Sequence, residues 1–131
     1  MRTRLAVFVA GLGLLLAAKP ALAHLAFAAE FDANKPIKLT GVVTKVEWLN
    51  PHTWFYIDVK DESGKVTNWG MEMGSPNGLM RAGWTRNSMK IRDVVTVEAF
   101  HARDGSNIAN VRVVILASTG QRLFAASSQG Q

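Results

Sequence analysis

The segment Lys45–Lys60, KVEWLNPHTWFYIDVK, decides the fold that this sequence predicts. It holds two stretches of β-type sequence joined at Asn50-Pro51-His52, with two of the four Trp residues and the only Tyr of the chain. Residues 53–60 alternate in polarity, which is typical of a strand with one buried face. The aliphatic set, expected to face the core, is Phe55, Ile57 and Val59, and the opposite face carries Trp54, Tyr56, Asp58 and Lys60.

A long strand is predicted immediately before this segment, over residues 37–48. Its apolar positions change phase: Ile37 and Leu39 are odd-numbered, whereas Val42, Val46 and Trp48 are even-numbered. The change falls at Gly41, where a bulge or a sharp bend would carry the strand from one side of a barrel to the other.

The sequence after this segment predicts three strands, one helix and a short final strand. A turn over residues 61–65 leads into a strand over 66–73, in which Trp69, Met71 and Met73 share a face. Ser75 can cap a short helix that has Pro76 in its first position and ends at Gly83. Strands follow over 94–103 and 109–117, the second with Val111, Val113 and Ile115 in phase, and residues 122–124 can fold back as a sixth piece.

This order of elements favours a mainly β fold, a small five- to six-stranded OB-like barrel with one short helix between the third and fourth strands. A β-sandwich is the main rival, but it does not require a helix at that point. The barrel is expected to span residues 37–124. An N-terminal arm over 24–36, either one helical turn or an extended segment, would precede it, and a flexible tail over 125–131 would follow it.

The first 23 residues have the pattern of a signal peptide. A short basic region, an apolar run of 14 residues from Leu5 to Ala18, and the small-x-small sequence at residues 21–23 follow one another. The run is too short for a permanent membrane span. We therefore expect a soluble periplasmic product that begins at His24.

Export changes the charge of the protein. Without Arg2, Arg4 and Lys19 the chain keeps 12 basic against 10 acidic residues, a net charge of +2. A nearly neutral surface argues against nucleic-acid binding, which needs clustered positive charge. The chain has no Cys, so no disulfide supports the fold.

The expected contact surface lies on the outward face of the second strand and on two loops. In an OB-like barrel the loop between strands 1 and 2 and the loop between strands 4 and 5 flank one face. Flat aromatic side chains beside mixed polar groups suit a small molecule or a protein partner. The candidate residues are Asn50, His52, Trp54, Tyr56, Arg103, Asp104 and Asn107. Alternatively, the N-terminal arm or the helix covers Trp54 and Tyr56, as large aromatics in strands are usually packed.

A copper site is the alternative for the strand over residues 66–73. Thioethers together with an imidazole form a soft ligand set that suits Cu(I). Trp69, Met71 and Met73 resemble part of the Trp, Met-x-Met and His set of small periplasmic OB-fold copper chaperones, and the resemblance implies His52 as the imidazole. The spacing from Trp to the first Met is one residue shorter here, and no His lies in the middle of the second strand. Without a metal, the same three residues form the core face of the strand.

The joint pattern of HLAFAAEFD, KVEWLNPH, IDVKDESGKVTNW, EMGSPNGLMRAGWTRNS, ARDGSNIAN and RLFAASS resembles a family of small exported proteobacterial proteins known as a domain of unknown function. This resemblance implies export and a compact β-barrel but no activity. The sequence has no recognisable catalytic motif, so we expect no enzyme and no cofactor. The leading hypothesis is a non-catalytic binding or accessory module. The alternatives are a periplasmic copper-binding protein and a partner-docking structural protein.

Overall fold

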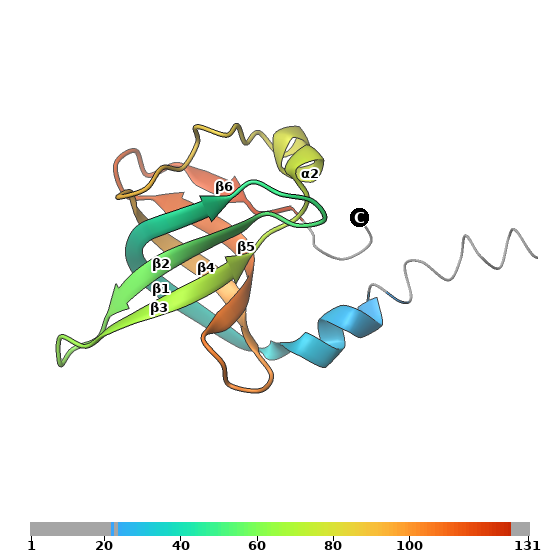
Figure 1. Ribbon diagram of the computed structural model, residues 1–131, viewed down its shortest axis with the longest axis horizontal. Coiled ribbons are helices and arrows are strands. Elements are labelled where there is room, and N and C mark those ends of the chain that lie inside the picture. The colour runs from blue at the N-terminus through green and yellow to red at the C-terminus, as the bar shows by residue number, and fades with distance from the viewer. Residues whose placement is uncertain (1–21, 23, 127–131) are drawn as a thin grey trace, which may run out of the picture.

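The computed structural model describes residues 22 and 24–126, and within these residues six strands form one curved sheet (Figure 1). The elements are β1 (Phe31–Glu47), β2 (Trp54–Lys60), β3 (Val66–Glu72), α2 (Pro76–Arg81), β4 (Val94–Ala102), β5 (Ile108–Leu116) and β6 (Arg122–Phe124). The strand order is β3-β2-β1-β4-β5-β6, and β3 also pairs in parallel with β5, which closes the sheet into a ring. The predicted OB-like barrel, with its helix between β3 and β4, is confirmed.

The first strand begins six residues earlier than predicted. Residues 24–30 are helical, and β1 starts at Phe31, which pairs with Ala102. The predicted turn at 32–36 is an irregularity inside the strand, because the next paired residue is Pro36 opposite Phe100. The arm is therefore a helical segment followed by a bulged strand. Phe27 of the helical segment fixes it to the barrel by packing on Phe31 and Phe100.

The phase change in β1 lies three residues later than predicted. Val42 is 41% exposed and Val43 is buried, so the prediction that Val42 shares the apolar phase of Val46 and Trp48 was wrong. The register between β1 and β2 shifts between Val43 and Lys45, and this bulge moves the core phase to Val46. Gly41 has a different role, because a Cβ there would lie 2.5 Å from the backbone oxygen of Asp58. Glycine is needed where β1 crosses close to β2.

A second bulge changes the phase of β5. Ala99 of β4 lies opposite Val111, but Glu98 lies opposite Val113, so Arg112 is an extra residue on β5. Val114 and Leu116 therefore join the core cluster in place of Ile115, which had been predicted to lie in phase with Val111.

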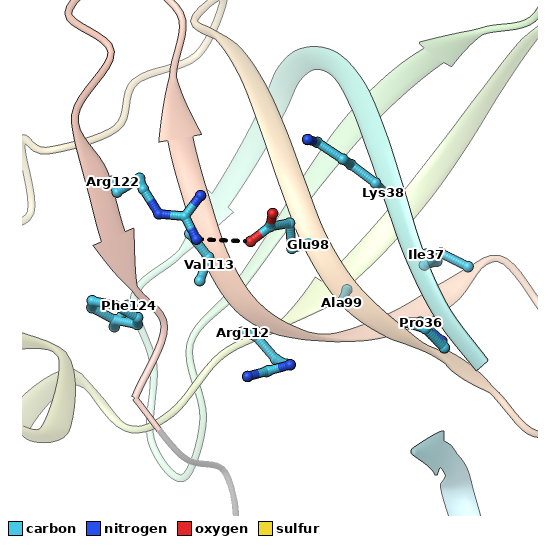
Figure 2. A pocket seen from close by; sticks show the side chains of 9 residues that line it. All are labelled: Pro36, Ile37, Lys38, Glu98, Ala99, Arg112, Val113, Arg122 and Phe124. Atoms are coloured by element: carbon cyan, nitrogen blue, oxygen red, sulfur yellow. Dashed lines mark hydrogen bonds and ion pairs between the residues drawn. The ribbon is translucent and has the colours of Figure 1, made fainter. Parts of the chain in front are cut away.

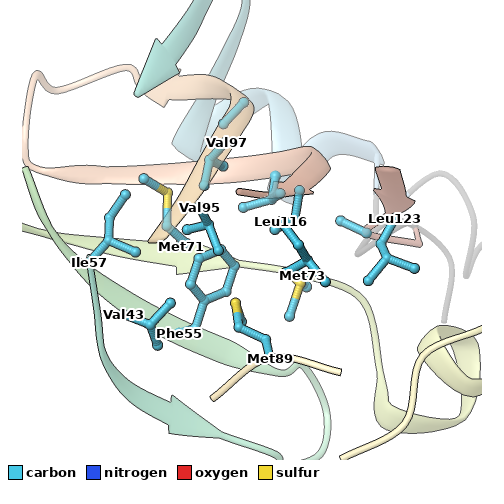
Figure 3. Packing of buried hydrophobic residues seen from close by; sticks show 14 of the residues in the cluster. Val43, Phe55, Ile57, Met71, Met73, Met89, Val95, Val97, Leu116 and Leu123 are labelled. Atoms are coloured by element: carbon cyan, nitrogen blue, oxygen red, sulfur yellow. The ribbon is translucent and has the colours of Figure 1, made fainter. Parts of the chain in front are cut away.

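The core lies inside the ring and is built from the inward faces of the strands (Figure 3). Phe55, Ile57 and Met71 have no exposed surface, as the alternation along β2 and β3 predicts. The helix α2 closes one end of the barrel: Ser75 accepts a hydrogen bond from the backbone N–H of Gly78 at 3.1 Å, and Leu79 is fully buried.

The barrel extends slightly beyond its predicted C-terminal limit. Ala125 is buried, donates its N–H to the carbonyl of Arg112 at 2.9 Å, and accepts from the N–H of Gly74 at 2.9 Å. It therefore belongs to the barrel and not to the predicted tail. The last five residues of that tail and the predicted signal peptide, apart from Leu22, lie outside the described residues. In the described part of the chain, no helix has the length and apolar character needed to cross a membrane.

Candidate functional site

Two rows of side chains cross the outward face of β1, β2, β3 and β5. The strand registers place them directly opposite one another from strand to strand. One row consists of Lys45, Tyr56, Gly70 and Ile108, and the next consists of Glu47, Trp54, Glu72 and Asn110. Side chains in such rows are close enough to interact. The register therefore sets two aromatic rings among carboxylates and amides.

A hollow of about 400 Å³ lies over these rows, at the joint between β3 and β5. It is lined by Glu47, Trp54, Tyr56, Asn68, Gly70, Asn107 and Ile108. Trp54 and Tyr56 are both half-buried. None of the described residues that line the hollow comes from the N-terminal helical segment or from α2.

Gly70 is the floor of the hollow. A Cβ at this position would lie 3.4 Å from Cε1 of Tyr56, 3.6 Å from Cζ3 of Trp54 and 3.8 Å from Cγ1 of Ile108, which are ordinary contact distances. Its N–H donates to the carbonyl of Asn107 at 3.0 Å, as any residue could. The barrel therefore does not require glycine here as it does at Gly41. The missing side chain leaves open the space between the two aromatic rings.

A cation already occupies the edge of this site. The ammonium of Lys45 forms an ion pair with Glu47 and lies 5.4 Å from the centre of the Tyr56 ring. The pKa of Lys45 is raised, first by its hydrogen bond to Glu47 and then by the negative charge of that carboxylate. The aromatic ring and the carboxylate together favour the charged form of the amine.

Glu72 is the most buried carboxylate on this face. It lies opposite Trp54, and its Oε1 accepts a hydrogen bond from Nδ2 of Asn110 at 3.1 Å. Nδ1 of His52 lies 4.0 Å from the same oxygen, which places the predicted His beside the second row.

Asp58 and Glu72, the two carboxylates on the outward face of β2 and β3, are not cross-strand neighbours. Asp58 lies opposite Asn68, and its Oδ1 accepts a hydrogen bond from Nδ2 of Asn68 at 2.9 Å. Asn68, which lines the hollow, is thereby held in place. The sequence did not reveal this pairing because it depends on the register between the two strands.

The structure brings together part of the predicted contact surface. Trp54, Tyr56 and Asn107 line the hollow, and His52 joins the same face through Glu72. Asn50 is exposed in the loop before β2.

Arg103 and Asp104 do not lie on this face, because the loop over 103–107 begins beside the N-terminal helical segment and ends at the hollow. Nε of Arg103 donates to the carbonyl oxygen of Ala28 at 3.0 Å, and the backbone N–H of Arg103 donates to the carbonyl oxygen of Glu30 at 2.8 Å. Arg103 thus binds the end of the helical segment. The carboxylate of Asp104 accepts a hydrogen bond from the backbone N–H of Ser106 at 2.9 Å. Hydrogen bonds from the side chain of Ser106, and then from its backbone, lower the pKa of Asp104.

Several residues of the site were not selected from the sequence. They are Lys45, Glu47, Asn68, Gly70, Ile108, Glu72 and Asn110. Alternation along β3 already puts Asn68, Gly70 and Glu72 on the face opposite Met71, so the signal for these three was present. The others depend on the β1 bulge and on the parallel pairing of β3 with β5.

The residues of the copper alternative are divided between two faces. Met71 and Met73 point into the core among aliphatic side chains (Figure 3), whereas His52 lies beside outward-facing Glu72. The His next to Trp69 is His101, with 5.2 Å between the ring centres. Among the described residues, no group of three or more His, Asp or Glu is arranged to hold a metal ion.

A second groove, of about 500 Å³, lies over β1, β4, β5 and β6 (Figure 2). Three cationic side chains, Lys38, Arg112 and Arg122, line it with one carboxylate, Glu98. Arg122 pairs with Glu98 at 3.1 Å, and Phe124 is exposed at the edge. This groove differs from the hollow in the sign of its charge.

The architecture is similar to that of a solved structure, Rim1, a mitochondrial single-stranded DNA-binding protein of S. cerevisiae. The two share a TM-score of 0.50 and 11% sequence identity over 66% of this chain and 94% of Rim1. At this identity the likeness shows the fold alone. Among curated proteins, none matches this sequence.

Residues 12–110 match the family of unknown function DUF6152. The match covers β1, β2, β3, α2, β4 and the first residues of β5. It confirms the family resemblance drawn from the sequence. The chain belongs to DUF6152, a family of unknown function.

Proposed function

We propose that the protein is an exported, non-catalytic binding module whose ligand occupies the hollow over Gly70. The observation that carries this proposal is that a strand residue with room for a side chain has none, between two half-buried aromatic rings. Glycine inside a strand weakens the sheet, so its presence needs a reason other than stability. Close approach of a ligand to the backbone provides one.

Export is supported by the N-terminal sequence, with its basic start, apolar run and small-x-small site. The proposed compartment is the periplasm and the proposed first residue is His24. N-terminal sequencing of the protein recovered from the periplasmic fraction tests both. Recovery of a chain that still begins with Met1 would contradict the proposal.

Nucleic acid is not the proposed ligand, although Rim1 is a single-stranded DNA-binding protein by name. Proteins that bind single strands combine stacking aromatics with a positively charged track for the backbone. The hollow has the aromatics, but none of the described residues that line it is cationic. Lys45 at its edge is already paired with Glu47, and Glu72 adds a further acidic group. Phosphates would be repelled at this face.

Catalysis is also not proposed. The polar side chains of the lining are two amides, a phenol and one ion-paired carboxylate. A general acid or base needs a proton partner within hydrogen-bond reach and a suitably perturbed pKa. The lining offers the shape and polarity of a recognition site.

Ligand mapping by nuclear magnetic resonance tests the proposal. The ¹⁵N-labelled protein is screened against a chemically diverse set of sugars, amino acids, short peptides and small amines. Binding at the hollow should shift the indole signal of Trp54 and the amides of Gly70 and Asn107. The Trp54→Ala variant should keep its fold and lose the interaction.

Phe124→Ala is the matched control, because Phe124 is an exposed aromatic on a different face. It should keep the interaction that Trp54→Ala loses. If hits map to the basic groove beside Phe124 and leave Gly70 unshifted, the proposed site is wrong. If Trp54→Ala unfolds, Trp54 is a core residue and the platform does not exist.

A further inference from the structure

We propose that the hollow over Gly70 takes an organic cation, an ammonium or guanidinium group, and that Lys45 competes with this ligand for Glu47. The inference rests on the proposed function and adds the chemical class of the ligand. It follows from the charges around Trp54, from the position of Lys45, and from the open floor at Gly70.

Acidic side chains flank Trp54 in the second row. Glu47 on β1 and Glu72 on β3 lie directly opposite Trp54 on its two neighbouring strands. A ring flanked in this way attracts a cation through its π-face, through the charge of Glu47 and through the acceptor oxygens of Glu72. The same arrangement repels an anion. The basic groove, by contrast, is lined by three cationic side chains and one carboxylate.

Lys45 lies where this face stabilises a cation. Its ammonium lies between a carboxylate and the ring of Tyr56, in the surroundings that the hollow offers to a ligand. The protein thus shows with its own side chain how a cation is held at this face. The raised pKa of Lys45 is consistent with that environment.

Lys45 can separate from Glu47. Its side chain is 61% exposed, whereas that of Glu47 is 27% exposed. Exposed ion pairs contribute little to stability, because water solvates both partners well. A ligand that also contacts Trp54 and the floor at Gly70 can therefore displace the lysine from Glu47.

The experiment measures the affinity of one cationic probe, spermidine, at constant ionic strength. Titration is followed through the Trp54 indole signal in the wild type and in two variants. Glu47→Gln should weaken binding by about two- to fivefold, and Lys45→Met should strengthen it by a similar factor. Glu62→Gln, an exposed carboxylate in the turn between β2 and β3, is the control and should leave the affinity unchanged.

The unchanged affinity of Glu62→Gln distinguishes this inference from general attraction to a negative surface, because such attraction would weaken with the loss of either carboxylate. Equal affinity of the wild type and Glu47→Gln would overturn it, as would weaker binding by Lys45→Met. Glucose and citrate are titrated in parallel as neutral and anionic probes. If either shifts Trp54 while spermidine does not, the cation inference is wrong and the proposed function stands. If no probe or library compound shifts Trp54, both are wrong.

Discussion

Phe55 and Met71 face each other inside the barrel and have no exposed surface, whereas Trp54 and Gly70 on the same two strands lie on the outward face at the hollow. Both pairs result from one alternation of side chains along β2 and β3. The inward residues are constrained by volume, because the interior is closely packed. The outward residues are constrained by which chemical groups the register brings together. Substitutions on the two faces should therefore affect different measurements.

The largest expected effect is on the inward face. Phe55→Ala should lower the free energy of unfolding by about 3–5 kcal/mol, because it leaves a cavity among rigid neighbours. Trp54→Ala should cost much less, on the order of 1 kcal/mol, since its side chain is half-buried. Urea unfolding followed by circular dichroism measures both. Equal losses would remove the distinction between the faces.

Gly41→Ala should come next, with a loss of about 1–3 kcal/mol from overpacking. The added Cβ would lie 2.5 Å from the backbone oxygen of Asp58, and neither backbone can move without disturbing the pairing of β1 and β2. Thermal unfolding of the variant tests this. An unchanged melting temperature would show that the strands separate more easily at the crossing than the structure indicates.

Gly70→Ala should have a small effect of the opposite sign. Its Cβ fits at ordinary distances, and alanine is better than glycine inside a strand by roughly 0.5–1 kcal/mol, so stability should be unchanged or slightly raised. The affinity of any ligand of the hollow should fall, because the methyl group fills part of the floor. A loss of stability as large as that of Gly41→Ala would mean that Gly70 serves the fold and not a ligand.

The smallest expected effect is on the pH dependence of stability and arises from Asp61, in the turn between β2 and β3. The carboxylate of Asp61 accepts hydrogen bonds from the hydroxyl of Ser63 and from the backbone N–H of Lys65. These bonds, that of the Ser63 hydroxyl above all, hold the pKa of Asp61 below its ordinary value of 3.8. A group whose folded pKa is depressed stabilises the fold above its unfolded pKa, and this contribution is lost as the pH falls through the folded pKa.

The stability difference between wild type and Asp61→Asn should therefore shrink as the pH is lowered from 6 to about 3. Urea unfolding at a series of pH values measures it. A difference that grows as the pH falls would contradict the assigned role of Asp61.

Much of the fold was predictable because it depends on local pattern. Alternation identified β2 and β3 and assigned Phe55 and Ile57 to the core, and Ser75 with Pro76 marked the start of α2. The bulge in β1 was predicted at Gly41 instead of near Thr44, and the bulge in β5 was not predicted, because a single extra residue leaves the hydrophobic pattern of a strand ambiguous. Val42 and Ile115 were placed in the apolar phases of their strands for that reason.

The candidate site was predictable only in part. Trp54 and Tyr56 follow from phase on one strand, and Asn107 follows from the loops that flank an OB face. The same argument selected Arg103 and Asp104, which lie at the other end of their loop beside the helical segment. A loop's position in the topology does not determine the direction of each of its side chains.

The sequence by itself determined that Trp54 and Tyr56 lie on one face of a strand and Phe55 and Ile57 on the other, because backbone geometry enforces a period of two. Only the tertiary structure decided what lies beside them. Glu47 and Glu72 flank Trp54 because the registers of β1 and β3 against β2 place them there, and Gly70 reaches Ile108 because β3 pairs with β5. These registers depend on the bulge in β1 and on the parallel pairing that closes the ring, and both are set by contacts between residues far apart in sequence. The aromatic face is thus a local property of the chain, and the charged surroundings that make it a candidate cation site are a property of the fold.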